Sequence, residues 1–174
     1  VDFRCTGSAE VSYKEKKTNP NVVVRAVDAN YLSVKGYDIK VGRNFTEVET
    51  ENNNNRAIIG IDLVEQLFDK NPQSALDQSI SVGNLRFKVI GVLAEKGTSS
   101  GGSSDRTVLI PLAVGKRVFG SAKTNYNLNI AAESSLDIDA GVDVATGLFR
   151  TVRGLRLSEE NDFVIKKDDS LVEI

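Results

Sequence analysis

The sequence contains no histidine, no methionine and no tryptophan, and it has a single cysteine and only three prolines. The absence of histidine removes the most common general base, the most common metal ligand and every Ser-His or Cys-His nucleophile. Most familiar classes of hydrolase are therefore excluded. Cys5 alone can form neither an internal disulfide nor a thiolate metal cluster, and we interpret it as a small buried hydrophobic residue.

Long apolar runs and a strong excess of one charge are missing too. Nowhere do about eighteen apolar residues follow one another, so we do not expect this stretch of chain to cross a membrane. A net charge of −2 offers no electrostatic basis for binding nucleic acid or anionic lipid. Val1 is not followed by a leader-like pattern and the sequence stops abruptly at Ile174, so we expect a domain excised from a longer polypeptide.

The composition that is present is that of a folded protein. Of the 174 residues, 40% are hydrophobic and 26% are charged, which is typical of globular rather than disordered chains. This length holds either one ordinary domain or two small lobes that share one polypeptide.

Short strands and tight turns dominate the first 120 residues. The predicted strands share β-branched or alternating apolar residues and cover residues 21–27, 37–41, 56–60, 79–82, 85–93 and 107–111. Gly83-Asn84 stands between two alternating runs and predicts a two-residue hairpin. A helical turn is expected at residues 28–32. A short helix is expected after Asp62, which we predict to cap it with Glu65, and to end at Asn71-Pro72.

Two segments of this region have the composition of loops. Residues 47–55 are acidic and then asparagine-rich, which predicts a solvated loop. Residues 96–106 are rich in glycine and serine, so we expect a mobile loop there, and one that is placed to touch a partner.

The last fifty residues predict a β-α-β unit of the split type. Residues 126–132 and 162–166 alternate as strands, and Ser135 is expected to cap the long helix between them. Arg150 and Arg153 stand in its last turn with Gly154 beyond, as a helix C-terminus favours. The apolar residues at four-three spacing form one helix face, and they are Ile138, Val142, Ala145, Phe149 and Val152.

The predicted fold class is therefore α+β, with two lobes. A β-rich lobe is expected over residues 11–120. A small α/β lobe with the β-α-β unit is expected from residues 121–174, to which residues 1–10 add a strand.

No nucleotide-binding motif is present. A phosphate-binding P-loop needs an upstream glycine and a hydroxyl after the lysine, and Gly115-Lys116-Arg117 has neither. Residues 97–102 are glycine-rich, but a strand rather than a helix follows, so the dinucleotide fingerprint fails as well.

Each charged cluster has a structural explanation that we prefer to a functional one. Asp137, Asp139 and Asp143 suit the start of a helix better than a metal site. Asp28 and Asn30 lack the other ligands of a calcium loop. Three further groups carry weak functional signals: the acidic set Glu47, Glu49 and Glu51, the basic set Arg150, Arg153 and Arg156, and the glycosylation sequon at Asn44. We predict no catalytic, metal-binding or cofactor-binding residue and no cofactor.

An ordered series of short motifs carries more information than any of these clusters. It consists of residues 24–32, Val34-Lys35-Gly36-Tyr37, residues 42–47 (Gly-Arg-Asn-Phe-Thr-Glu), residues 57–60, residues 66–68, Val89-Ile90-Gly91-Val92-Leu93 and residues 108–112. In order and spacing, the series resembles the extracytoplasmic core domain of MacB-like ABC-transporter permeases. Two departures concern local loop geometry: Ala26 stands where that family usually has glycine, and residues 71–78 replace a tighter connection.

The resemblance implies a domain held outside the cytoplasmic membrane, in the periplasm or outside the cell, between two transmembrane helices of a permease. It implies a β-rich lobe, and an α/β lobe made from both ends of the insertion. ATP hydrolysis would belong to a separate domain or subunit, and the present domain would relay that motion to substrate export or to a partner. The implied partners are the permease's own transmembrane helices, an ABC ATPase, a second permease copy, and a periplasmic adaptor or the exported substrate.

We therefore predict a non-catalytic extracytoplasmic domain of an ABC-transporter permease. The alternative is a secreted, non-catalytic binding or adhesion module, for which two α/β lobes would serve equally well. An enzyme ranks last because no base, nucleophile or metal cluster has suitable spacing.

Overall fold

The computed structural model describes residues 1–96 and 105–167, and the chain forms two compact units, Val1–Asn129 and Ile130–Ile174. The described strands are β1 (Asp2–Ala9), β2 (Val11–Tyr13), β3 (Lys16–Lys17), β4 (Val22–Val27), β5 (Ile39–Gly42), β6 (Arg56–Ile59), β7 (Ser79–Val82), β8 (Leu85–Leu93) and β9 (Thr107–Pro111). The described helices are α1 (Tyr31–Val34), α2 (Glu47–Glu51), α3 (Ile61–Leu67), α4 (Pro72–Ala75), α5 (Leu112–Phe119) and α6 (Ile138–Arg153), with a 3₁₀ turn at Ser135–Asp137.

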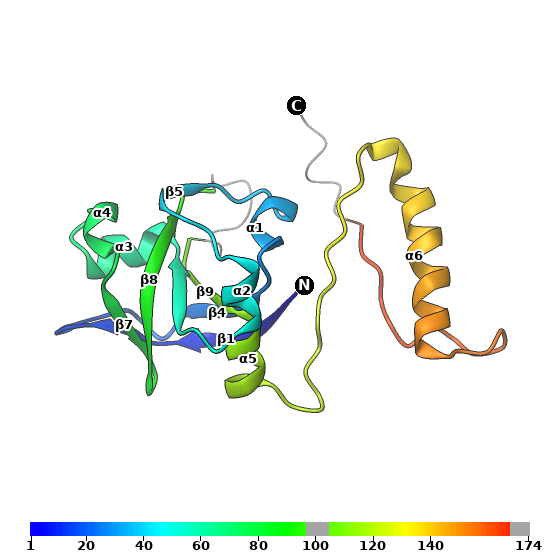
Figure 1. Ribbon diagram of the computed structural model, residues 1–174, viewed down its shortest axis with the longest axis horizontal. Helices are drawn as coiled ribbons and strands as arrows, with labels where there is room; N and C mark the ends of the chain where they lie inside the picture. Colours follow the sequence, from blue (N-terminus) through cyan, green and yellow to red (C-terminus); the bar gives the residue numbers. More distant parts are fainter. Residues whose placement is uncertain (97–104, 168–174) are drawn as a thin grey trace. The chain divides into compact units, whose positions relative to one another are not determined.

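One mixed sheet organises the first unit (Figure 1). Its order over the described residues is β1-β4-β9-β6-β8-β7-β2-β3, and β5 pairs with β8. The pairs β4–β9 and β6–β8 are parallel, and the other pairs are antiparallel. Because only Glu10 separates β1 from β2, a single bent stretch of chain contributes to both ends of this order. The two ends of the sheet are thus tied together.

Apolar side chains cover both faces of the central strands. All five residues of β9 are buried, and successive residues point to opposite faces. Val108 and Ile110 belong to the main core, whereas Leu109 belongs to a second cluster with Tyr31 and Phe45. Burial on both faces explains why these strands read as continuous apolar runs rather than alternating ones.

The hairpin predicted at Gly83-Asn84 is confirmed. β7 and β8 pair with Val82 opposite Leu85 and Ile80 opposite Phe87. Gly83 has a φ of 58°, a left-handed conformation that glycine adopts without strain. The predicted strands at 21–27, 37–41, 56–60 and 107–111 are likewise present as β4, β5, β6 and β9.

Three local predictions in this unit were wrong. Residues 47–51 form the helix α2 rather than loop, because Thr46 and Glu49 make a reciprocal capping box. Asp62 does not cap α3, whose N-cap is Gly60. The close approach of the Asp105 backbone explains this, since its carbonyl accepts the Asp62 N–H at 3.1 Å and leaves no room for a side chain at position 60. The predicted end of this helix at Asn71-Pro72 was also wrong, because α3 ends at Leu67 and Asn71 instead caps α4.

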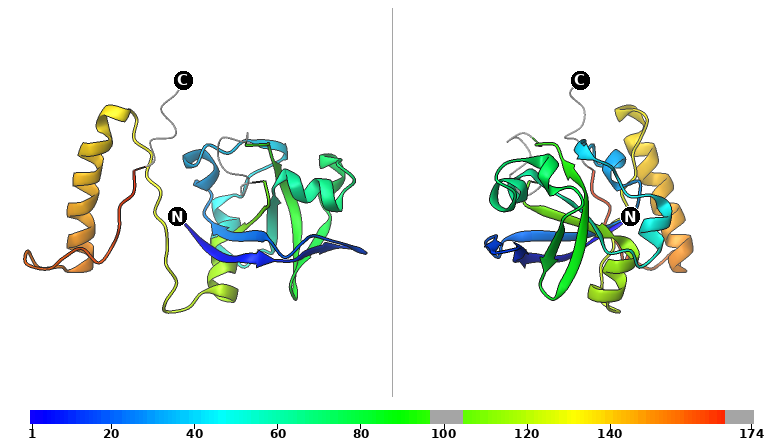
Figure 2. Two further views of the ribbon diagram at one scale, coloured as in Figure 1. Left: turned by 180° about the vertical axis from the view of Figure 1, so that it is seen from behind. Right: turned by 60° about the vertical axis from the view of Figure 1, so that its left-hand side comes forward.

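The second unit is built around α6, as the helix prediction required. Its C-terminus has Gly154 at a φ of 67°, and the chain then returns along the helix (Figure 2). The N-terminal cap differs from the prediction, because Ser134 rather than Ser135 accepts a backbone N–H, that of Leu136. The strands predicted at residues 126–132 and 162–166 are not formed in the described part of the chain, where the one pairing in these ranges is the isolated bridge between Asp2 and Asn127.

The division of the chain differs from the predicted boundaries. β1 pairs with β4 along its length, from Asp2 opposite Val27 to Ala9 opposite Val22. Residues 2–9 thus contribute to the sheet of the first unit, which extends to Asn129. The joint lobe of residues 1–10 and 121–174 stays a prediction for a longer protein. Among the described helices, none combines the length and the apolar character needed to span a bilayer.

Close packing of α5 against β4 (Figure 1) depends on Gly115 and generates the first testable prediction. A Cβ at this position would lie 2.2 Å from the Cβ of Ala26 and 3.1 Å from the ring of Phe3. We expect Gly115→Ala to lower the free energy of unfolding by about 1–3 kcal/mol, because the Cβ of Ala26 cannot yield without moving backbone. Urea unfolding followed by circular dichroism measures this change. Gly147→Ala is the matched control, since nothing lies within 4 Å of its added Cβ. An equal loss in both variants would contradict the packing argument.

Candidate functional site

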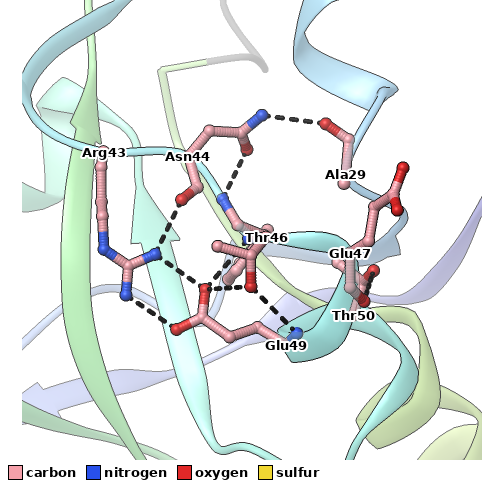
Figure 3. Close-up of polar contacts among 8 residues, drawn as sticks. Ala29, Arg43, Asn44, Thr46, Glu47, Glu49 and Thr50 are labelled. Atoms are coloured by element: carbon pink, nitrogen blue, oxygen red, sulfur yellow. Dashed lines mark hydrogen bonds and ion pairs between the residues drawn. The ribbon is translucent and has the colours of Figure 1, made fainter.

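The strongest polar constellation in the first unit joins β5 to α2. The Arg43 guanidinium donates two parallel hydrogen bonds to the Glu49 carboxylate, Nη1 to Oε2 and Nη2 to Oε1, both at 2.7 Å (Figure 3). The Glu49 side chain also accepts the Thr46 N–H at 3.0 Å, while Thr46 Oγ1 accepts the Glu49 N–H at 3.2 Å. This bidentate geometry is the strongest form of a carboxylate–arginine pair.

The neighbouring asparagine belongs to the same arrangement. Asn44 Nδ2 donates to the Ala29 carbonyl at 2.9 Å, and its Oδ1 accepts the Phe45 N–H at 2.8 Å (Figure 3). The amide nitrogen that glycosylation would modify is therefore already engaged in holding the chain after β5. We interpret the Arg43–Glu49 network, together with the Asn44 contacts, as a latch that fixes α2 to the sheet.

Electrostatics within the latch favour the ionised form of Glu49. The hydrogen bonds from Arg43 are the main cause that lowers the pKa of this carboxyl from 4.5 to about 2, and the Thr46 backbone N–H adds to the effect. The Glu49 side chain is only 13% exposed, so solvent screens the pair less than a surface pair. Of the predicted acidic set at positions 47, 49 and 51, Glu49 alone is turned into this network.

A buried carboxylate anchors the end of the first unit. Asp2 is 1% exposed, and its oxygens accept hydrogen bonds from the Arg25 guanidinium, from Asn127 Nδ2 and, at 2.7 Å, from Asn129 Nδ2. Its backbone also exchanges two hydrogen bonds with Asn127. A buried charge is tolerated only when it is paired in this way, so the cluster fixes residues 127–129 to β1.

The remaining acidic candidates take structural roles. Asp137 is the N-cap residue of α6, and Asp139 forms an ion pair with Lys167. Asp28 accepts from the terminal ammonium group of Val1 at 2.5 Å, and Asn30 is the N-cap residue of α1. Within residues 1–96 and 105–167, no three carboxylate, thiol or imidazole groups gather as a metal site would require.

The basic set at the end of α6 is engaged within the second unit. Arg150 donates to the carbonyls of Arg156 and Glu159, and to Asn161 Oδ1 at 2.6 Å. Arg153 pairs with Asp162 through Nε and Nη2. These contacts hold the returning chain against the helix, as does the packing of Phe149 against Phe163 at 5.1 Å between ring centroids.

An uncovered apolar surface is the main feature of the second unit. None of the residues of α6 is buried: Ile138, Val142, Ala145 and Phe149 of the predicted apolar face are half-buried, and its fifth residue, Val152, is 84% exposed. The other strongly exposed apolar residues of this unit are Ile130, Leu136, Val144, Leu148, Leu157 and Val164. A helix with such a face normally packs it against another element.

The other positions singled out in the sequence carry no chemistry of their own. Cys5 lies half-buried on β1 beside the main core, and burial raises the pKa of its thiol to about 12, so the thiolate is scarce at neutral pH. Gly115-Lys116-Arg117 lies inside α5, where Gly115 packs on Ala26. Most of the predicted partner loop, residues 97–104, lies outside the described residues. Its described flanks meet where the Lys96 N–H donates to Asp105 Oδ1 at 3.3 Å.

Comparison with known proteins identifies relatives along most of the chain. The model of a family described as MacB-like periplasmic core domain matches residues 3–148. A macrolide export ATP-binding/permease protein MacB of Bradyrhizobium diazoefficiens is 24% identical over 94% of this chain and 24% of its own length. The MacB protein of Syntrophobacter fumaroxidans is 33% identical over 70% of this chain and 17% of its own length. The chain thus spans about a quarter or less of these relatives.

Solved structures agree with the fold. The extracellular domain of the noncanonic ABC-type transporter YknZ from Gram-positive bacteria superposes with a TM-score of 0.69 at 26% identity, covering 89% of this chain and 76% of that one. The periplasmic region of MacB from Actinobacillus actinomycetemcomitans has a TM-score of 0.68 at 15% identity, covering 88% of this chain and 66% of that one. The second likeness bears on the fold alone.

The latch generates a prediction about stability and pH. The pKa of Glu49 is about 2 in the folded protein and 4.5 for the free residue, so its stabilising effect is complete above pH 4.5 and disappears as the pH falls toward 2. We expect Glu49→Gln to lower the free energy of unfolding by about 1–2 kcal/mol at pH 7, because the neutral amide keeps the cap but loses the bidentate ion pair with Arg43. The difference from the wild type should shrink between pH 4.5 and 2 in urea titrations.

Glu51→Gln on the same helix is the control, because it removes the same charge without touching the latch. If Glu51→Gln destabilised the protein as much as Glu49→Gln, net charge rather than the latch would account for the effect.

Proposed function

Because the chain belongs to the MacB-like periplasmic core domain family, we propose that it is the non-catalytic extracytoplasmic part of an ABC-transporter permease. In that role it relays ATP-driven motion from the membrane to substrate export or to a partner protein. The family match over residues 3–148 is the observation that carries this proposal.

The build of the first unit supports a mechanical role. A relay must move as a body, and rigidity comes from strands that are buried on both faces and from a sheet whose ends are tied together. The latch from Arg43 to Glu49 fixes α2 to that sheet, and the Asp2 cluster fixes the residues where the unit ends. Motion applied at the ends of the chain would therefore be transmitted rather than absorbed.

ATP hydrolysis belongs elsewhere in this proposal. The sequence has no P-loop, whereas the curated relatives are named ATP-binding/permease proteins and are about four times as long as the matched chain. The partners we propose are the permease's own transmembrane helices and an ABC ATPase domain or subunit. A second permease copy, a periplasmic adaptor and the exported substrate are the further partners that the family suggests.

We also propose that the second unit forms part of an α/β lobe in the full-length protein. The uncovered face of α6 supports this, and so does the length of the solved relatives: about a quarter of the YknZ extracellular chain has no counterpart here. Such a lobe would supply a strand partner to residues 162–166 and a cover for the exposed apolar residues of α6.

Thiol labelling tests the lobe. We expect Val152→Cys to react readily with a maleimide in the 174-residue chain, where Val152 is 84% exposed, and at least ~10-fold more slowly in the full-length permease, because burial suppresses thiol reactivity. Asp143→Cys lies on the opposite side of α6 and should react in both proteins. Native Cys5 contributes little background because of its raised pKa. Equal labelling of Val152→Cys in both proteins would refute the lobe.

A domain-replacement experiment tests the relay. Residues 1–174 are exchanged for a Gly/Ser linker in the full-length gene, and the product is compared with the wild type in a deletion strain. We expect membrane-inserted protein that still hydrolyses ATP while export is lost, measured as sensitivity to macrolides and other toxic compounds and as secretion of lipoproteins and peptides. Export that continues at the wild-type level would contradict the relay.

A parent reading frame with a signal peptide but no apolar span of about twenty residues would favour the secreted binding module instead.

A further inference from the structure

A pocket of about 300 Å³ opens on the first unit where β5, β6 and β8 meet the chain that follows α4. Its lining includes Arg43, Arg56, Asp77 and Lys88, together with the half-buried Leu76. This volume is at the small end of ligand pockets and suits a single side chain better than a whole metabolite.

The walls of the pocket are held by specific backbone contacts. Gly42 has a φ of 83°, and a Cβ there would lie 2.2 Å from the carbonyl oxygen of Ile90. That carbonyl accepts the Arg43 N–H at 3.0 Å. The pairing of β6 with β8 skips from Ala57 opposite Val89 to Ile58 opposite Gly91, so Ile90 is an extra residue in β8. Bulges of this kind re-aim side chains next to binding sites.

Like charges lie side by side in this pocket. Arg56 and Lys88 are register partners in the parallel pair of β6 and β8, which places both cations on the same face of the sheet. Directly opposed like charges destabilise a sheet. Arg43 adds a third cation from β5. Three cationic side chains therefore line one small pocket, although the net charge of the whole protein is −2.

The carboxylates near the pocket leave one cation without a partner. Arg43 is engaged with Glu49, and Lys88 pairs with Asp77 at 2.8 Å. Among the ion pairs of the described residues, none involves Arg56. Both cations act on Asp77. Its hydrogen bond with Lys88 is the main cause that lowers the pKa of its carboxyl, and the charge of Arg56 lowers this pKa by a smaller amount.

We propose that this pocket binds a carboxylate side chain presented by a peptide segment of a partner protein, with Arg56 as its principal anchor. A guanidinium binds a carboxylate bidentately, and a bound carboxylate would relieve the repulsion between Arg56 and Lys88. The half-buried Leu76 offers apolar contact to the methylene groups of a glutamate, which an inorganic anion would not use. The inference rests on the pocket alone and does not depend on the proposed relay.

NMR titration of the 174-residue chain tests the proposal. The probe is the blocked peptide acetyl-Gly-Glu-Glu-Gly-amide, and acetyl-Gly-Gln-Gln-Gly-amide is its neutral match. We expect saturable shifts of the backbone amides of Arg43, Asp77 and Lys88 with the glutamate peptide and none with the glutamine peptide. Inorganic phosphate forms the second arm. Phosphate that saturated the same amides more tightly than the peptide would assign the pocket to small anions and overturn the proposal.

Two arginine variants complete the test. Arg56→Gln should weaken binding of the glutamate peptide by at least about fivefold, because it removes the charge-assisted contact. Arg4→Gln, on β1 outside the pocket, removes the same charge and should leave the affinity within about twofold. The melting temperature of Arg56→Gln should not fall below that of the wild type, since the substitution relieves repulsion from Lys88. Equal affinities for both variants would refute the role of Arg56.

Discussion

The bend between β1 and β2 is the constraint on which the first unit depends. β1 pairs with β4 at one end of the sheet order, and β2, one residue later, pairs with β7 near the other end. Because the chain between them is only Glu10, the sheet cannot lie flat. It curls around the main core, where Phe3 and Val11 from the two halves of the bend are both fully buried. The β7–β8 hairpin pairs with β2 at one end of this bend, and α5 packs on β4, the strand next to β1.

The polar contacts of this unit act mainly on its edges. Burying the Asp2 carboxylate would cost several kcal/mol without partners, and Arg25, Asn127 and Asn129 supply them. The chain therefore leaves the first unit at a defined place. Arg43 does the same for α2 through Glu49, so a five-residue helix that would be marginal alone is held in place. The pocket around Arg56 differs from both, because its charges are only partly compensated within the described residues. Uncompensated charge in a well-packed protein is more readily explained by binding than by stability.

Much of the strand arrangement could be predicted because its signals are local. Gly83-Asn84 and the alternation around it specify both the turn and the register of the hairpin. The helix α2 shows where this fails. The capping box of Thr46 and Glu49 is readable in the sequence, but the asparagines that follow it favoured a loop. The Arg43–Glu49 pair was missed because residues 47–55 were interpreted as a loop. The charges around Arg56 could not be predicted, because nothing local indicates which residues of β5, β6 and β8 become neighbours.

The sequence by itself determined most strands of the first unit, the long helix α6, the absence of familiar catalytic motifs, and the ordered motifs that are shared with the family. Only the tertiary structure decided which of those elements are covered. β9 and α6 both carry apolar residues with clear periodicity, yet β9 is buried on both sides and α6 has no buried residue. The physical reason is that periodicity depends on neighbours along the chain, whereas burial depends on contacts between distant segments. Such contacts bring Arg43, Arg56 and Lys88 to one pocket, where β5 and β6 both pair with β8.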